Sequence, residues 1–555
     1  MNYSSKILSQ LVVELCISKE INHIVISPGS RNAPLIVGFT SQNYFTCYSI
    51  VDERCAAFFA LGLAQQLQKP VAIVCTSGSA ALNYYPAIAE AYYSDIPLVV
   101  ITADRPSHLV DIGDGQTIRQ EHVYANHIEY SANCKEGEEF QEYNEAEINK
   151  ALNTAIEKQG PVHINVPFSE PLYLRVAEKN STPKIITPSL LQDVVDVIHL
   201  KNLAEKWNVA SKKMILVGTL FPYTIDSKLL ESLANDTTVI VLTETTSNLH
   251  HKNFFPAIDQ LISSLSEKES KMLQPDILVT FGGMVVSKRI KAFLRKYSPK
   301  EHWHVGLKNA NDTFFCLTDH LKNSPNTFWE HFLPLTISST SNYQIGALKL
   351  KEAKLEKQLQ FEANMPFSDF SVYHSIFKSI PDNTQLQLAN STAIRYAQLF
   401  PLVPSLQVFC NRGTSGIDGS TSTAVGAAVA SQNPVVFITG DLSFFYDSNA
   451  LWNKYIPNSF RIILVNNAGG GIFRILPNAK EVAHFEDFFE TKHALTAEHL
   501  CAMFGFEYRS ATTMESVENA LKNFYSEGNK PKLLEVFTPS EINDKVLKDY
   551  FTAIS

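Results

Sequence analysis

The feature that most constrains this chain is a repeated unit in which a short apolar strand ends in a small-residue turn and a helix follows. "HIVISPGS", "PVAIVCTSGSAAL" and "IPLVVITADRP" show it early in the chain. Strands that alternate with helices form parallel sheets with crossover helices. Because ligands of such sheets bind at the carboxyl ends of the strands, we expect the functional residues to lie in these turns.

The pattern occurs in three segments. A charged stretch containing Ser and Pro, "LRVAEKNSTPKIITPS", follows the first segment and predicts a linker. A charged helical stretch over residues 340–365 precedes the third segment. We therefore expect three α/β domains, over residues 1–180, 190–340 and 365–555.

Composition narrows the class of protein. The chain has 555 residues and a formal net charge of −9, which argues against nucleic acid as a partner and means that anionic ligands must be met by local basic residues. Its 8 Cys include no C-x-x-C pair, which is typical of free thiols in a reducing compartment. The N-terminus predicts an amphipathic helix rather than a signal peptide, and no apolar run reaches membrane-spanning length. We expect a cytoplasmic protein with no membrane insertion.

Two turns carry polar residues directly after buried strands. Asp441 follows "VVFITG", and Asn467 ends "RIILVNN" 26 positions later, about one strand-helix-strand unit. Either turn alone is common without any function. Together they bring a carboxylate, an amide and the carbonyl of Gly469 to one sheet edge, and these hard oxygen ligands suit Mg²⁺ or Mn²⁺.

A carboxylate pair begins the alanine-rich apolar stretch "IVDERCAAFFALGLAQ". Asp52 suits a helix N-cap, and Glu53 in the first turn suits the helix dipole. From this stretch alone capping is the favoured interpretation, since burying an unpaired charge is costly.

The Gly-Asp to Asn-Asn interval and the stretch "TSGSAALNYYPAIAEAYYSDIPLVVITADRP" resemble thiamine diphosphate-dependent enzymes of the pyruvate oxidase and decarboxylase type. The resemblance implies three doubly wound parallel-sheet domains, with the cofactor's pyrimidine held by the first domain and its diphosphate and metal by the third. It implies that Glu53 is a buried catalytic glutamate that activates the cofactor by sharing a proton with the pyrimidine ring. The implied cofactor-binding residues are Glu53, Ile417, Gly440, Asp441, Leu442, Ser443, Asn467, Ile472 and Phe473.

Within that family the chain is most similar to the branch that acts in menaquinone biosynthesis. "SPGSRNAPL", "GQTIRQ", "ANSTAIR", "NRGTSGIDGSTSTAVG" and "GDLSFFYD" carry this resemblance. It implies decarboxylation of 2-oxoglutarate and conjugate addition of the resulting succinyl-semialdehyde carbanion to isochorismate. It also implies a homodimer or dimer of dimers with active sites between subunits.

Both implied substrates are dicarboxylates, so an acidic protein needs local cations to bind them, and Arg is the usual choice. For any single Arg an ordinary surface ion pair is the default. Ile417 matches the aliphatic residue that supports a bent cofactor, and Ile472, Phe473 and Leu476 would wall its thiazolium side, although core packing explains them equally well. The candidate substrate residues are Ser30, Arg31, Arg105, Gln116, Lys288, Asn390, Ser391, Arg395, Arg412, Phe473 and Leu476.

Two other functions stay open. A related thiamine diphosphate-dependent 2-oxoacid decarboxylase or carboligase, such as an acetolactate-synthase-like enzyme, would keep Glu53, Asp441 and Asn467 but not the Arg set. A nucleotide-binding scaffold on the same fold would need no buried Glu53.

Overall fold

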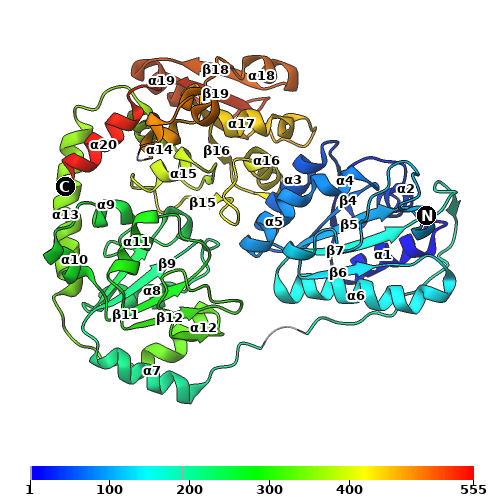
Figure 1. Ribbon diagram of the computed structural model, residues 1–555, viewed down its shortest axis with the longest axis horizontal. Helices are drawn as coiled ribbons and strands as arrows, with labels where there is room; N and C mark the ends of the chain where they lie inside the picture. Colours follow the sequence, from blue (N-terminus) through cyan, green and yellow to red (C-terminus); the bar gives the residue numbers. More distant parts are fainter. Residues whose placement is uncertain (1–2, 190–191, 477) are drawn as a thin grey trace.

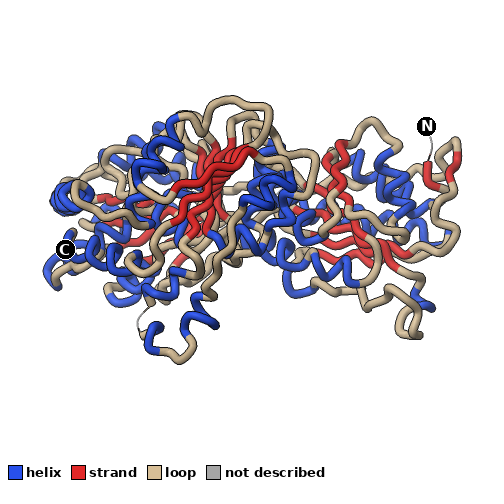
Figure 2. Tube along the Cα trace, turned by 90° about the horizontal axis from the view of Figure 1, so that it is seen from above, coloured by secondary structure: helices blue, strands red, loops and turns tan. Residues whose placement is uncertain are grey.

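The computed structural model describes residues 3–189, 192–476 and 478–555. Three parallel sheets, each flanked by helices, follow one another along the chain (Figure 1). Viewed from above, the strands of the N-terminal sheet stand apart from those of the other two sheets, which overlap in that view (Figure 2). The predicted α/β class and parallel-sheet architecture are confirmed.

The N-terminal sheet has six strands in the order β3-β2-β4-β5-β7-β6. Its strands are β2 (His23–Ile26), β3 (Thr46–Ser49), β4 (Val71–Cys75), β5 (Leu98–Asp104), β6 (Tyr130–Asn133) and β7 (Val162–Pro167). Its helices are α1 (Ile7–Ser18), α2 (Ala33–Thr40), α3 (Glu53–Leu67), α4 (Ser79–Asn83), α5 (Tyr85–Ser94) and α6 (Gln141–Lys158). The predicted N-terminal helix corresponds to α1, but the expectation that it is amphipathic is wrong, because the helix is mostly buried and none of its residues is exposed.

The C-terminal sheet repeats this topology, in the order β15-β14-β16-β17-β19-β18. Its strands are β14 (Gln385–Leu388), β15 (Gln407–Cys410), β16 (Val435–Gly440), β17 (Arg461–Asn466), β18 (Glu507–Ala511) and β19 (Lys532–Phe537). Its helices are α14 (Asp369–Ser379), α15 (Thr392–Ala397), α16 (Ser420–Ala430), α17 (Asp441–Tyr446), α18 (Glu498–Phe504), α19 (Met514–Lys522) and α20 (Asn543–Ala553). In both sheets the second strand lies outside the first and the sixth lies between the fourth and the fifth.

The middle sheet has five strands in the order β10-β9-β11-β12-β13. These are β9 (Lys213–Val217), β10 (Val239–Thr243), β11 (Ile277–Phe281), β12 (Glu301–Val305) and β13 (Asp319–Leu321). The helices of this unit are α7 (Val197–Val209), α8 (Ser227–Asn235), α9 (Ile258–Ile262), α10 (Glu267–Leu273), α11 (Lys288–Lys296) and α12 (Pro325–Phe332). Helix α13 (Tyr343–Glu362) then leads along the left side of Figure 1 to the C-terminal unit.

The sequence patterns missed some short elements. The predicted linker after Leu174 begins with a two-residue strand, β8 (Arg175–Val176), which pairs antiparallel with β1 (Tyr3–Ser4). Strands β3 and β18 were also missed, because half-exposed strands lack the apolar run that marks a buried one. The predicted boundary at residue 190 lies outside the described residues.

The N-terminal and C-terminal units meet where helix α3 packs on helix α16, at the centre of Figure 1. The helices approach so closely that a Cβ on Gly62 would lie 2.1 Å from the Thr423 carbonyl oxygen, and one on Gly426 would lie 2.0 Å from that of Phe59. Glycine is required at both positions. The apolar stretch of α3 from Cys55 to Ala64 is buried, as its composition predicts.

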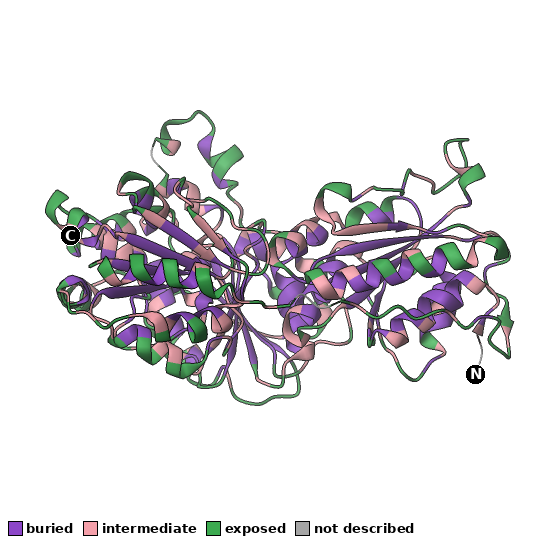
Figure 3. Ribbon diagram, turned by 90° about the horizontal axis from the view of Figure 1, so that it is seen from below, coloured by how far each residue is buried: buried purple, intermediate pink, exposed green. Residues whose placement is uncertain are grey.

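Burial follows the layers of the fold. The strands of all three sheets are largely buried, and exposed residues lie on the outer helices and loops (Figure 3). None of the described helices is long and apolar enough to cross a membrane.

Candidate active site

The two polar turns of the C-terminal sheet meet at one edge, as predicted. Strands β16 and β17 are adjacent and parallel, and Asp441 and Asn467 follow their carboxyl ends. The Asp441 carboxylate accepts a hydrogen bond of 2.9 Å from the Gly469 backbone N–H. Gly469 has φ +150°, and a Cβ there would lie 2.6 Å from the Glu490 carbonyl oxygen, so the turn requires glycine.

Asp369, at the start of α14, orients the Asn467 amide. Its carboxylate accepts 2.9 Å from Asn467 Nδ2 and 2.6 Å from Thr538 Oγ1. Burial, with a smaller contribution from the charge of Asp441, raises the pKa of Asp369 to about 6. Because Nδ2 is held by Asp369, Asn467 Oδ1 is the atom left to bind a cation. Sequence analysis missed Asp369, whose position after Ser368 has the pattern of an ordinary helix start.

His493 also borders this turn and was missed. Its Nε2 lies 3.4 Å from the Asp441 carboxylate, and its Nδ1 accepts a hydrogen bond from the Leu495 N–H. The Leu495 bond places the imidazole proton on Nε2, facing Asp441. The described residues contain no group of three or more His, Cys, Asp or Glu side chains that could hold a metal. The predicted ligands (one carboxylate, one amide oxygen and one carbonyl) nevertheless fit Mg²⁺, which completes its shell with phosphate and water.

At the start of α3, Asp52 and Glu53 have different roles. The Asp52 side chain caps the helix by accepting from the Cys55 N–H at 3.2 Å. Glu53 accepts a hydrogen bond of 3.2 Å from Asn83 Nδ2 and is only partly buried within one chain. The expectation that Glu53 is buried is therefore wrong for the single chain, because no element of the same chain covers this end of the helix completely.

Polar contacts fix the start of α3 to the segment that follows α17. Asp52 accepts 2.9 Å from Asn449 Nδ2, and Arg54 donates 2.9 Å to the Tyr446 carbonyl oxygen. Asp447, which is fully buried, lies 3.5 Å from the Arg54 guanidinium. Glu53 thus lies at a junction where polar contacts join the N-terminal and C-terminal units.

A cavity of about 370 Å³ lies between the middle and C-terminal units. Its lining includes three predicted apolar residues, Ile472, Phe473 and Leu476, together with the cations Lys288 and Arg395. Burial, and to a smaller extent the charge of Arg412, lowers the pKa of Arg395. The cavity therefore combines an apolar wall with positive charge.

Asn390 holds Arg412 in place. Its Oδ1 accepts 2.6 Å from Arg412 Nη1, and its Nδ2 donates 2.7 Å to the carbonyl oxygens of Asn411 and Gly416. The neighbouring Ser391 has φ +70°, an unusual conformation for a residue with a side chain. In this structure Asn390 supports the arginine loop.

The predicted residues of the N-terminal unit form a separate group. Arg31 is buried and donates 2.7 Å to the Phe168 carbonyl oxygen, while Arg105 lies 3.8 Å from Asp114. Ser30 and Gln116 are exposed. Among the described residues that line the cavity near Arg395, none comes from the N-terminal sheet unit.

The remaining predicted cofactor residues surround the Asp441 turn. Ser443 Oγ donates 2.7 Å to the carbonyl oxygen of Ile417, whose side chain is 39% exposed. Gly440 ends β16, and Leu442 donates its N–H to the Asp441 carboxylate at 2.7 Å. An exposed Ile417 beside this turn is available to contact a ligand.

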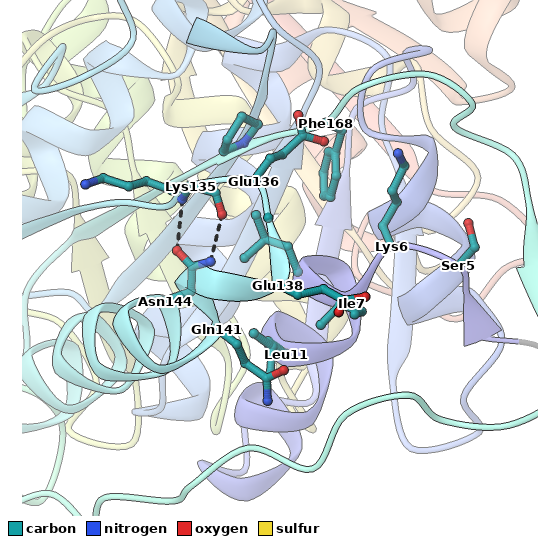
Figure 4. A pocket seen from close by; sticks show the side chains of 13 residues that line it. Ser5, Lys6, Ile7, Leu11, Lys135, Glu136, Glu138, Gln141, Asn144 and Phe168 are labelled. Carbon is teal, nitrogen blue, oxygen red and sulfur yellow. Dashed lines mark hydrogen bonds between the residues drawn. The ribbon is translucent and has the colours of Figure 1, made fainter.

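A second, smaller cavity of about 190 Å³ lies at the start of α1 (Figure 4). Asn144 closes one side through hydrogen bonds of 2.9 Å and 2.8 Å with the backbone N–H and C=O of Lys135. Its described lining includes none of the predicted site residues.

Three family models match the chain. Residues 7–128 match the "Thiamine pyrophosphate enzyme, N-terminal TPP binding domain", residues 191–388 the "Middle domain of thiamine pyrophosphate" and residues 391–536 the "Thiamine pyrophosphate enzyme, C-terminal TPP binding domain". The solved structure of benzoylformate decarboxylase from Polynucleobacter necessarius has the same fold, with a TM-score of 0.72 over 97% of this chain and 99% of that chain at 15% identity.

Two curated relatives are similar over their whole length. Both are named 2-succinyl-5-enolpyruvyl-6-hydroxy-3-cyclohexene-1-carboxylate synthase. The protein from Christiangramia forsetii is 55% identical over 99% of both chains, and that from Flavobacterium johnsoniae is 53% identical over 100% of both. The chain belongs to the thiamine pyrophosphate enzyme family, among the 2-succinyl-5-enolpyruvyl-6-hydroxy-3-cyclohexene-1-carboxylate synthases.

Proposed function

We propose that the protein decarboxylates 2-oxoglutarate and joins the resulting four-carbon unit to isochorismate, giving 2-succinyl-5-enolpyruvyl-6-hydroxy-3-cyclohexene-1-carboxylate and carbon dioxide. The observation that carries this proposal is the cavity beside Arg395, in which cations border an apolar wall. Guanidinium and ammonium groups suit the carboxylates of both substrates, and the apolar wall suits the ring of isochorismate.

Thiamine diphosphate is the cofactor of this family, and Asp441, Asn467 and the Gly469 carbonyl would hold Mg²⁺ or Mn²⁺ against its diphosphate. When bound, the cofactor would supply a nucleophilic carbon that adds to the keto carbon of the substrate, and an electron sink for the negative charge left when carbon dioxide departs. Asp369 keeps Asn467 Oδ1 directed toward the cation, and Ile417 supports the cofactor. Ile472, Phe473 and Leu476 exclude water from the reacting face.

Glu53 would share a proton, through its carboxylate oxygens, with the pyrimidine ring of the cofactor. Its partial exposure supports a site completed by a second copy of the chain, which would cover it. Large apolar side chains are exposed around it: Val51 (44%), Leu82 (45%), Tyr446 (55%) and Trp452 (52%). Val51 and Leu82 lie beside Glu53 and its partner Asn83, and Tyr446 and Trp452 flank the segment bonded to the start of α3. A homodimer or dimer of dimers would bury this apolar surface.

In that arrangement Glu53 and the N-terminal group of Arg31 and Arg105 from one subunit face Asp441 and the cavity of the other. Lys288, Arg395 and Arg412 then bind substrate carboxylates on the C-terminal side. Ser30, Gln116 and Ser391 supply hydrogen bonds to the substrates. We divide the chain at residues 1–180, 190–340 and 365–555 into pyrimidine-binding, central, and diphosphate- and metal-binding domains.

One assay tests the reaction directly. Carbon dioxide release from 2-oxoglutarate should depend on thiamine diphosphate and Mg²⁺, and mass spectrometry should detect the isochorismate adduct. Release of carbon dioxide from pyruvate instead, with no adduct, would favour an acetolactate-synthase-like enzyme. Absence of cofactor binding in calorimetry would contradict any thiamine-dependent function.

A further inference from the structure

Two buried glutamates, in different units of the chain, make the same unusual contact. Glu90 on α5 accepts hydrogen bonds from two consecutive backbone N–H groups, those of Gly413 at 2.7 Å and Thr414 at 2.6 Å. Glu244, directly after β10, accepts from Val286 at 2.6 Å and Ser287 at 2.7 Å. Glu90 is 1% exposed and Glu244 is 2% exposed.

Each glutamate holds a loop next to a cation of the candidate site. Arg412 directly precedes Gly413, and Lys288 directly follows Ser287. In the ion pairs of the described residues neither Arg412 nor Lys288 takes part. Because backbone N–H groups satisfy the buried carboxylates, neither carboxylate forms an ion pair with Arg412 or Lys288. The two cations can therefore bind an anionic ligand.

The contact with Glu90 also crosses between units. A Cβ on Gly413 would lie 2.5 Å from the Glu90 carbonyl oxygen and 2.8 Å from Ser94 Oγ, so the loop lies directly on α5. Thr414 adds a third bond, from its Oγ1 to Glu90 at 2.8 Å. The N-terminal unit therefore fixes the position of the loop that carries Arg412.

The Glu244 contact fixes the start of α11. Ser287 caps this helix through Oγ, which accepts from the Ile290 N–H at 3.1 Å and donates to the Asp259 carboxylate. Burial raises the pKa of Glu244 to about 7, against the opposing effect of the two N–H groups. Glu244, Asp259, Ser287 and Lys288 all line the cavity that contains Arg395.

We propose that Glu90 and Glu244 are positioning residues, which fix the loops that carry Arg412 and Lys288 so that both cations meet the substrate carboxylates. This inference rests on the proposed function, in which those cations bind substrate. Glu244 borders the cavity, but both of its carboxylate oxygens accept from backbone N–H groups, so neither glutamate is assigned a bond to substrate or cofactor.

Glu90→Gln and Glu244→Gln test the inference, since the amide NH₂ of Gln would face a backbone N–H. Each variant should raise the KM for at least one of the two substrates by roughly 10- to 100-fold, the effect of a misplaced binding group. Thiamine diphosphate affinity should stay at the wild-type value. Glu145→Gln is the matched control: Glu145 is also buried and accepts 3.1 Å from the Lys184 N–H, but it lies outside the site, so this variant should lose stability and keep both KM values.

A double-mutant cycle separates positioning from general stability. In an Arg412→Ala background, Glu90→Gln should change KM by less than about twofold, because it acts through a cation already removed. Lys288→Ala with Glu244→Gln should behave in the same way. KM effects that multiply, or single variants with wild-type KM, would overturn the inference.

Amide hydrogen exchange tests whether the glutamates hold the two loops without relying on turnover. Exchange at Gly413 and Thr414 should accelerate in Glu90→Gln, and exchange at Val286 and Ser287 in Glu244→Gln, while other amides stay protected. Glu90→Asp and Glu244→Asp replace any Gln variant that does not fold and should show the same local acceleration. Unchanged exchange in both variants would refute the inference. Local acceleration in the variants, together with a wild-type protein that makes no adduct, would refute only the proposed function.

Discussion

The N-terminal and C-terminal sheets share one topology but differ at their carboxyl edges. The third strand of the N-terminal sheet ends at Cys75 and is followed by Thr76, whereas that of the C-terminal sheet ends at Gly440 and is followed by Asp441. After the fourth strand the contrast is Arg105 against Asn467. The same backbone thus presents cation ligands on one sheet and a cation on the other, so function depends on the side chains at these edges and not on the fold.

The helices that follow the second strands are equivalent as well. Helix α3 follows β3 and α16 follows β15, and the two pack against each other through Gly62 and Gly426. Helix α3 begins with Asp52 and Glu53, while α16 begins after Gly419 with Ser420 and no carboxylate. Only the N-terminal copy carries an acid at this position, which supports a role for Glu53 beyond capping.

Glu53→Gln should have the largest effect, because it removes the acid that distinguishes α3 from α16. Gln keeps the size but cannot exchange a proton, so turnover should be nearly abolished while the melting temperature stays near wild type. Hydrogen–deuterium exchange at the cofactor's thiazolium carbon should slow in parallel. An unchanged exchange rate would return Glu53 to a helix-dipole role.

Asp441→Ala should make the third turn of the C-terminal sheet resemble its N-terminal counterpart. Loss of an anionic ligand should weaken Mg²⁺-dependent cofactor binding by roughly 100-fold, the upper range for changes around a metal site. Cofactor titration at fixed Mg²⁺ measures this. Asp104→Asn, at the edge of the N-terminal sheet, is the control and should leave the Mg²⁺ dependence unchanged; an equal effect of both variants would reject the metal assignment.

Mixing these two variants tests whether the sheets act across subunits. Glu53→Gln and Asp441→Ala should each be inactive alone, but a heterodimer has one site with both lesions and one with neither. After full exchange at equal concentrations roughly a quarter of wild-type activity should return, since half the dimers are mixed and half of their sites are intact. Verified exchange without recovery would place both residues in a site within one chain.

The arginines sharpen the contrast between the two sides of the site. Arg395→Ala or Arg412→Ala should raise the KM for a substrate or slow its step. The change should correspond to a free-energy loss of about 1.5–3 kcal/mol, the range for hydrogen bonds to charged groups. We expect the larger effect on isochorismate, since the C-terminal unit carries both arginines. Arg31→Ala should in addition lower the melting temperature, because Arg31 is buried and bonded to Phe168. Pre-steady-state kinetics separates the two substrates, and normal kinetics in both Arg395→Ala and Arg412→Ala would reduce them to surface charge.

Asp52→Ala should have the smallest effect. Loss of the N-cap should cost about 1 kcal/mol of unfolding free energy, measured by denaturant titration. Turnover should fall far less than in Glu53→Gln. A comparable loss of turnover would show that the two neighbouring carboxylates act together.

Much of the fold was predictable because its signals are local. Buried parallel strands such as β16 and β17 are continuous apolar runs, and the residues after them must lie at one edge, so Asp441 and Asn467 could be paired from spacing alone. Short half-exposed strands such as β3 carry no such run and were missed. The domain boundaries proposed for the chain stay a prediction.

The sequence by itself determined the residue types and their strand-end positions: a carboxylate at the start of α3, oxygen ligands after β16 and β17, and cations on several turns. Only the tertiary structure decided which buried carboxylates hydrogen-bond to which loops and side chains of the site. Asp369 and Asn467 are 98 positions apart, and Glu90 reaches Gly413 across 323 positions, so no periodicity links them. A buried carboxylate takes whatever donors the packing brings within about 3 Å, and the packing of three units against one another is a property of the whole chain rather than of any local stretch.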